Sequence, residues 1–394
     1  SEQSGSWGRI AFAVAGAVLI GLGVILLFAY NWEKMHKFAK LGVIFLALIS
    51  AHSAALIVNR PAARETLHAL GTMLFGAGIW LVAQVYHINE HYPNAFLVWG
   101  IGALSLAWFL PSLPQALMAA FLFVLWNGFE VFDFHNRNYP AAIIILFGVL
   151  PLAGILRSRV LASAGLAAFL FTLFNLIENL GWILVMPVFF SVAAALIAVG
   201  LILKRAERFT ELAPPCFFYG NVLYFLILYI LSFRGTREAL IYLTREHGAG
   251  HWFTASLVIA LGLWVYALWP FHTIRERIDE GLRVDYLAVP VALILYSLQF
   301  FGVIKLEGAL ATMPYNLLVL FSAVMLMQHG FRTLHLRSAV MGSLLLTALA
   351  IARYTDLFQS LLARAAVFLL VGGMMVGIGI FFARARKAKQ EAAR

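Results

Sequence analysis

The chain has 394 residues, of which 63% are hydrophobic and only 12% are charged, and its formal net charge is +10. Soluble domains are usually about 45–50% apolar and about 25% charged, so one water-soluble core cannot bury this much apolar surface. The single cysteine, Cys216, excludes an intramolecular disulfide and a cysteine-based metal cluster. The basic residues form no stripe with interleaved aromatic residues, which argues against a nucleic-acid partner. The composition therefore predicts an integral membrane protein whose first partners are membrane lipids.

Apolar runs long enough to cross a bilayer recur along the whole chain. A transmembrane helix needs about 20 apolar residues, and fourteen candidate runs occur, at 7–30, 39–58, 66–88, 94–111, 114–132, 140–156, 160–177, 182–203, 213–232, 251–271, 286–304, 313–330, 336–353 and 361–383. Most connections between them are short. We therefore predict an all-α, polytopic transmembrane helical bundle, in which residues 1–394 form a single integral-membrane domain with a basic tail at 383–394.

Lys and Arg residues are distributed unevenly between the two predicted faces of the membrane. With fourteen spans both termini lie on one side, whose segments hold 18 Lys and Arg residues, against 10 on the other side. Short loops rich in Lys and Arg tend to stay on the cytoplasmic side of the membrane. The distribution therefore predicts that both termini are cytoplasmic.

The segments predicted to lie on the outer face are chemically richer than the inner ones. They combine carboxylates, imidazoles, amides, aromatic rings and bases, whereas most inner segments are plain Arg and Lys clusters. An ionisable group at the edge of the hydrocarbon is costly without a partner or a wet cavity. We infer a polar cavity that opens toward the outer leaflet; the alternative is that lipid headgroups satisfy each group separately. The outer segments are 31–40, 86–94, 130–140, 175–181, 233–251, 305–308 and 352–360.

Candidate substrate-binding residues come from four of these segments and, for Gln84, from the end of the apolar run before residues 86–94. Lys34 and Arg353 would hold an anionic group, since a guanidinium fork suits bidentate contact with phosphate or carboxylate. An ion pair between Arg353 and Asp356 on one helix face is the alternative. Glu90 or Glu178 would serve as counter-charge or proton carrier. The full set is Asn31, Trp32, Lys34, Gln84, Tyr86, His87, Asn89, Glu90, Glu178, Arg353 and Asp356.

A short histidine motif invites a metal interpretation. His87, Glu90 and His91 match the H-x-x-E-H pattern of inverted zinc proteases. Pro93 follows two residues after His91, and the residue before a proline is biased away from helix. A third ligand would have to come from a distant acidic residue such as Glu130. We therefore predict neither a metal nor a cofactor.

Other ionisable residues have simpler readings. Glu33 follows the first run directly, where membrane glycosyltransferases that use polyprenyl-phosphate sugars often place a catalytic carboxylate. A Glu33–Lys37 pair at i, i+4 on a helix is the simpler interpretation. His52, His68 and His329 stand apart from other chemistry in the sequence, and we interpret them as structural residues.

Three short motifs are similar to those of a known family. They are YNWEKM at 30–35, AQVYHI at 83–88, and ARYTD followed by LLARAAVFLLVGG before the basic tail. In these the chain resembles the bacterial family of predicted membrane proteins called domain of unknown function 2157. The resemblance implies a multi-pass protein of a bacterial inner membrane and brings no established activity.

Three functions remain open at this point. The leading hypothesis is that the outward-facing cavity binds, and transports or flips, an anionic amphiphile such as a lipid-linked envelope precursor. One alternative is an outer-face transferase or hydrolase that acts on a lipid-linked substrate, with Glu33, His87 or Glu90 as acid or base. Another is a membrane scaffold that holds a periplasmic partner protein, chiefly through residues 233–251. Whether the protein is an enzyme is left undecided.

Overall fold

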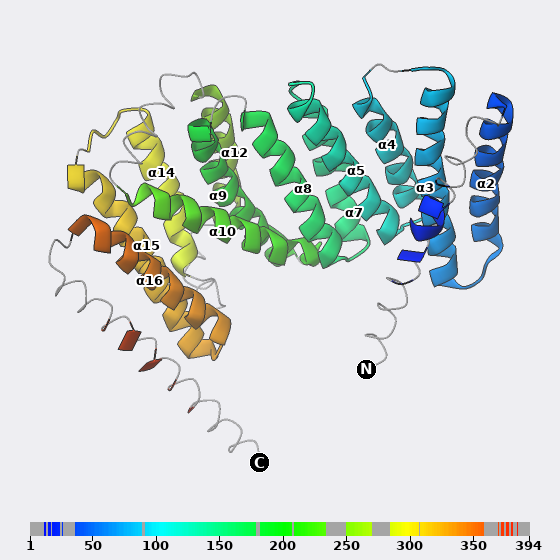
Figure 1. Ribbon diagram of the computed structural model, residues 1–394. Coiled ribbons are helices and arrows are strands. Elements are labelled where there is room, and N and C mark those ends of the chain that lie inside the picture. Colours follow the sequence, from blue (N-terminus) through cyan, green and yellow to red (C-terminus); the bar gives the residue numbers. More distant parts are fainter. Residues whose placement is uncertain are drawn as a thin grey trace, which may run out of the picture. The chain divides into compact units, whose positions relative to one another are not determined.

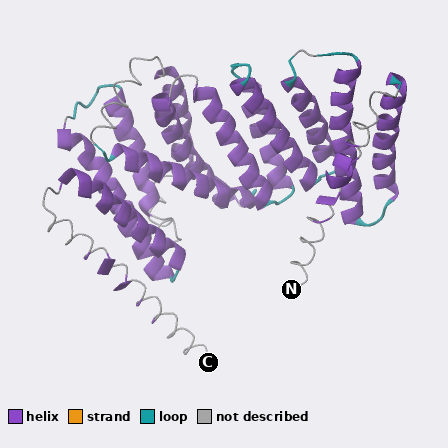
Figure 2. Cartoon of the chain, in the orientation of Figure 1, coloured by secondary structure: helices purple, strands orange, loops and turns teal. Residues whose placement is uncertain are grey.

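Helices account for all the regular structure that can be described. The computed structural model describes residues 36–88, 91–178, 182–206, 209–233, 250–269, 284–306 and 308–357, with scattered positions in 12–26 and 369–384. In these residues the chain forms helices joined by turns and short loops, and no strand occurs (Figure 1, Figure 2). The predicted all-α class is therefore confirmed.

The apolar runs of the sequence correspond to helices. Within the described residues, eight helices are long and apolar enough to cross a membrane, and four shorter apolar helices accompany them. Together they coincide with the twelve predicted runs between residues 39 and 353, while the runs 7–30 and 361–383 lie mostly outside the described residues. The protein is thus a membrane protein with several apolar helices. The count of fourteen spans and the cytoplasmic termini stay predictions.

The chain divides into two compact units. The first unit contains Ser1–Asn179 and Glu207–Pro215, and the second contains Leu180–Ala206 and Cys216–Arg394. The prediction that the chain is a single integral-membrane domain stays a prediction.

In the first unit, the helices α2 to α5 each pack against the next helix in the sequence, and α8 packs against α5. They are α2 (Lys37–Ile57), α3 (Pro61–Val85), α4 (Pro93–Phe109), α5 (Leu113–Phe132) and α8 (Arg159–Glu178) (Figure 1). Prolines stand in the first turn of α3, α4 and α5, where the ring suits the helical φ and the missing N–H costs nothing. Alanines such as Ala103, Ala107, Ala116 and Ala119 are fully buried between the helices. Small side chains allow close helix approach, as is common in membrane bundles.

A π-helical turn interrupts the helix over residues 139–155. It consists of α6 (Tyr139–Ile144), the π-helix η2 (Ile145–Val149) and α7 (Leu150–Ile155). A π-helical turn contains one extra residue and disturbs the regular hydrogen bonds beside it. The indole N–H of Trp108 on α4 donates to the carbonyl of Gly148 at 3.0 Å, so a neighbouring helix supplies a hydrogen-bond donor to a carbonyl of this turn.

The 3₁₀-helix η3 (Thr210–Leu212) belongs to the first unit, although the helix before it in the sequence belongs to the second unit. There, the carboxylate of Glu211 accepts a hydrogen bond from the guanidinium of Arg159 at the start of α8. Both side chains are partly exposed, so this ion pair contributes little to stability.

The second unit is built around large aromatic side chains. Its elements are α9 (Trp182–Ala206), α10 (Ala213–Leu231, from Cys216 onward), α12 (Gly250–Leu268), η5 (Val284–Leu287), α14 (Ala288–Phe300), α15 (Gly308–Thr333) and α16 (Leu336–Leu357). Phe190, Tyr224, Phe253 and Tyr296 are fully buried, and their rings pack against one another. Where α15 and α16 pack, a Cβ on Gly342 would lie 2.6 Å from the carbonyl oxygen of Ala323, so only glycine permits this approach.

Candidate functional site

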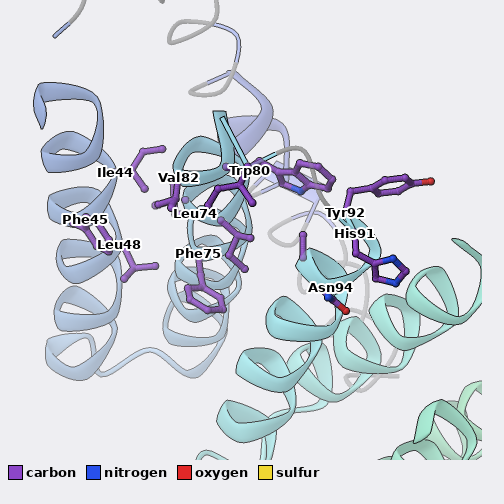
Figure 3. A pocket seen from close by; sticks show the side chains of 15 residues that line it. Ile44, Phe45, Leu48, Leu74, Phe75, Trp80, Val82, His91, Tyr92 and Asn94 are labelled. Atoms are coloured by element: carbon purple, nitrogen blue, oxygen red, sulfur yellow. The ribbon is translucent and has the colours of Figure 1, made fainter. Parts of the chain in front are cut away.

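A cavity of about 470 Å³ lies in the first unit between α2, α3 and the start of α4 (Figure 3). This volume falls within the range of about 300–1,000 Å³ that is typical of ligand pockets. Most of its wall is apolar and comes from side chains such as Ile44, Phe45, Leu74, Phe75, Trp80 and Val82. The lining is more apolar than that of the cavity expected from the sequence.

Helical periodicity builds the apolar wall. Leu74, Gly78 and Val82 follow at four-residue intervals on α3, and Ile44 and Leu48 do so on α2. Residues four apart share one face of an α-helix, so these two stripes face the same space. The local sequence therefore forms an apolar groove without any polar residue along its length.

Polar groups of the cavity are confined to one end. His91, Tyr92 and Asn94 line it where the turn after α3 leads into α4. Figure 3 shows the side chains of His91 and Tyr92 extending from the start of α4 to the side away from α2. None of the residues that line the cavity is acidic. The cavity can therefore hold a molecule with an apolar body and a polar end.

A buried carboxylate on α5 holds His91 in place. Glu130 is 7% exposed, and its Oε1 lies 2.6 Å from Nε2 of His91. The same carboxylate accepts hydrogen bonds from Trp126 Nε1 and Asn136 Nδ2, both at 3.1 Å. A buried carboxylate is stable as an anion only when hydrogen-bond donors surround it. Three N–H donors do so here, and the arrangement fixes the imidazole ring beside the cavity.

Tyr92 makes a second contact from the turn to the end of α5. Its hydroxyl donates a hydrogen bond to Asp133, which raises the pKa of Tyr92 because ionising the phenol would break this bond next to a carboxylate. The ring of Phe134 packs against both His91 and Tyr92, with centroid distances of 4.3 and 5.5 Å. The turn before α4 is thus attached to α5 by two polar contacts and one shared ring.

A second polar cluster lies near the opposite ends of α3 and α5. Nδ1 of His52 on α2 lies 3.1 Å from Nδ1 of His68 on α3. The hydroxyl of Thr72 donates to Oε1 of Gln115 at 2.9 Å, and the indole of Trp99 donates to the Thr72 carbonyl at 2.7 Å. His52 and His68, which stand apart in the sequence, therefore contact each other in the fold.

The structure brings together three of the residues predicted to bind substrate. Gln84, Tyr86 and His87 lie at the end of α3 and in the turn after it, and all three are exposed. His87 adopts a left-handed backbone conformation with φ 53°, which turns the chain toward α4. None of the three lines the cavity.

The other predicted residues are placed elsewhere or are not described. Arg353 belongs to α16 in the second unit, where its guanidinium donates to the carbonyl of Ser232 at 2.5 Å and lies 5.7 Å from the ring of Phe233. Glu178 and Asp356 lie in α8 and α16, and their side chains are outside the described residues. Also outside them are Asn31, Trp32, Lys34, Asn89 and Glu90. The roles proposed for these residues stay predictions.

The two histidines of the motif have different surroundings. Nε2 of His91 contacts Glu130, and His87 is exposed on the turn. Among the described residues, no group of three or more His, Cys, Asp or Glu side chains could hold a metal ion. Glu90, the acid of the motif, lies outside these residues.

Sequence reasoning missed the His91–Glu130 pair as a feature of its own. The signal was present, because α4 and α5 form a hairpin and the two residues lie nearly equidistant from its turn at Pro111. Residues equidistant from such a turn lie at the same level of an antiparallel helix pair. The same count around the loop at 58–60 would have brought His52 close to His68.

Comparison with known proteins gives one match. Residues 1–116 match the family model described as "Predicted membrane protein (DUF2157)". The family resemblance is therefore confirmed for residues 1–116, which include α2, α3, α4 and two of the three motifs. No curated protein and no solved structure matches the chain.

Proposed function

We propose that this is a multi-pass protein of a bacterial inner membrane that binds an anionic amphiphile and transports or flips it. The cavity between α2, α3 and α4 carries the proposal, because its apolar groove ends in a polar rim. A lipid-linked precursor of the cell envelope has this shape, with a long apolar chain and a polar head. The apolar chain would lie along Leu74, Gly78 and Val82, with the head beside His91 and Asn94.

The environment of the cavity decides which part of such a ligand gives affinity. A bilayer already surrounds a lipid chain with apolar groups, so moving the chain into a protein groove gains little from the hydrophobic effect. The groove then orients the ligand, and selectivity comes from polar contacts with the head. We therefore expect affinity to depend weakly on chain length and strongly on the chemistry of the head.

Native mass spectrometry of the protein, extracted gently from its own membrane, tests the proposal. Wild type should retain a lipid adduct. Ala95→Phe adds a ring inside the cavity and should remove the adduct, because Ala95 lines the cavity from α4. Val98→Phe is the matched control, since Val98 is 48% exposed on the same helix and does not line the cavity.

The outcomes separate the proposal from its alternatives. Loss of the adduct in Ala95→Phe but not in Val98→Phe supports it, and the mass of the adduct identifies the lipid class. Equal retention in both variants, or a wild-type chain without lipid, contradicts it. A stoichiometric protein partner in place of a lipid would favour the scaffold hypothesis.

A further inference from the structure

The two ring nitrogens of His91 have different surroundings. Nε2 lies 2.6 Å from the Glu130 carboxylate. Nδ1 has no hydrogen-bond partner among the described residues. It is also not one of their fully buried polar atoms that lack a partner. Nδ1 is therefore accessible, on a residue that lines the polar end of the cavity and whose side chain is 32% exposed. The ring extends to the side away from α2 (Figure 3), so a head group would reach Nδ1 at the rim of the cavity and not between α2 and α3.

The bond to Glu130 determines what Nδ1 can offer a ligand. A neutral imidazole has one N–H, and the carboxylate partner favours the tautomer that carries this N–H at Nε2. Nδ1 is then a hydrogen-bond acceptor, which repels an anionic oxygen. With one added proton, Nδ1 becomes a charged donor, while Nε2–H remains bonded to Glu130. An anion can bind at Nδ1 only if a proton binds with it.

The charged neighbours of His91 are compatible with this protonation. Glu130 on α5 faces it directly, and Asp133 lies one helical turn further along, bonded to Tyr92. His135 and Arg137 are exposed in the loop after α5, and His87 is exposed after α3; no contact of these with His91 is found. On α2, Lys40 lies one turn before the cavity residue Ile44 and has a partner of its own. Glu90 precedes His91 and is outside the described residues.

From this arrangement we infer that His91 is the head-group site of the cavity and that it binds a phosphate-type anion together with one proton. The inference rests on the proposed function. The proton enters at Nδ1 of His91 and lies between the imidazole and a phosphate oxygen, while Glu130 keeps its negative charge. Binding therefore couples the amphiphile to one proton, and histidine is the side chain whose charge ordinarily changes between about pH 5 and pH 8.

Two probes that share one apolar chain and differ in their head groups test the inference. The first is the methyl phosphodiester of farnesol, whose single negative charge does not change between about pH 5.5 and pH 8.5; the second is farnesol itself. Binding to the full-length protein in nanodiscs is measured by calorimetry over this range. Affinity for the phosphodiester should increase by up to about tenfold for each pH unit lowered, with uptake of one proton, because the anion favours the protonated ring. Affinity for farnesol should not change with pH.

Three variants locate the effect. His91→Gln should bind farnesol normally, which shows that it is folded, and should bind the phosphodiester weakly at every pH. Glu130→Gln should shift the increase in affinity to lower pH, because the positive ring loses its negative partner. His135→Gln is the matched control, since this histidine is exposed at the same end of the unit, and it should behave as wild type.

The other outcomes contradict either the proton-linked site or the proposed function. If both probes bind but neither shows pH dependence, the proton-linked site is wrong and the amphiphile function stands. The same holds if His87→Gln, and not His91→Gln, abolishes the pH dependence. If affinity for the phosphodiester increases as pH is raised, the inference is wrong in sign. If neither probe binds the wild type, the proposed function itself fails.

Discussion

The first unit contains two clusters of buried polar groups, and the two differ in how these groups are hydrogen-bonded. In one, the Glu130 cluster of Glu130 and His91, three N–H groups donate to one buried carboxylate, and one imidazole nitrogen stays accessible at the rim of the cavity. In the other, the His52 cluster of His52, His68, Thr72 and Gln115, the polar groups contact one another. Two of its buried nitrogens, His68 Nε2 and Gln115 Nε2, have no hydrogen-bond partner among the described residues.

The difference shows what a polar group inside a membrane bundle can be used for. Intramembrane polar groups are costly, so each one is either paired for structure or kept for function. The His52 cluster joins α2, α3 and α5 through contacts among its own side chains, which suits a structural role. The Glu130 cluster places an accessible nitrogen at the polar end of a cavity, which suits a binding site.

The largest expected effect comes from removing the carboxylate of the Glu130 cluster. Glu130→Ala leaves the N–H groups of His91, Trp126 and Asn136 without their acceptor. A hydrogen bond to a charged group typically contributes about 1.5–3 kcal/mol of unfolding free energy, and three such bonds are lost here. Thermal unfolding in nanodiscs, followed by circular dichroism, should show a large fall in Tm. The control is Asp133→Ala, since Asp133 is an exposed carboxylate three residues later. An equal fall in both variants would show that the buried position of Glu130 has no special role.

A smaller effect is expected in the His52 cluster from one added methyl group. A Cβ on Gly71 would lie 2.5 Å from Nε2 of His52, so Gly71→Ala must displace the imidazole ring and weaken its contact with His68. Overpacking of this kind costs about 1–3 kcal/mol. In a His52→Ala background the same substitution should cost much less, because the obstructing ring is gone. Tm values of the four proteins give the coupling directly. A similar cost in both backgrounds would contradict this assignment.

The smallest effect is expected at the exposed hydrogen bond between Tyr92 and Asp133. Because this bond raises the pKa of Tyr92 above its ordinary value of 10.0, the bond and its contribution are complete below about pH 10 and are lost as pH rises through the raised pKa. The difference in tyrosinate absorbance between wild type and Tyr92→Phe should therefore develop above pH 10. In Asp133→Asn the same difference should develop at lower pH. A midpoint that does not move would show that the bond is absent in solution.

Much of the fold could be predicted because the membrane imposes one pattern. The run 114–132 coincides with α5 and the run 39–58 with α2, since a long apolar stretch that ends at a polar loop has few other interpretations. Pairings between helices were harder to predict. His91 was interpreted as part of a local motif, and Glu130 was named only as a possible distant metal ligand, whereas the two residues meet at the open end of the hairpin of α4 and α5.

The cavity itself could not be predicted. Its lining residues, such as Phe45, Leu74 and Val82, have the same chemistry as lipid-facing residues, and only the packing of three helices shows which of them enclose space. The predicted cations Lys34 and Arg353 came from counting charges near the membrane edge. That reasoning finds groups with the right chemistry but says nothing about which helices bring them together.

Because of the π-helical turn over Ile145–Val149, the helix can lose one residue without a change in which faces are buried before and after the turn. Each residue turns an α-helix by about 100°, so deleting one residue from a regular helix rotates everything after it onto a new face. A π-helical turn contains one residue more than an α-helical turn and absorbs that rotation locally. Losing one residue there would restore a regular helix and keep Ala141 and Leu152 on their buried faces. At this stretch the chain can therefore change its length by one residue and keep the same side chains packed against the neighbouring helices.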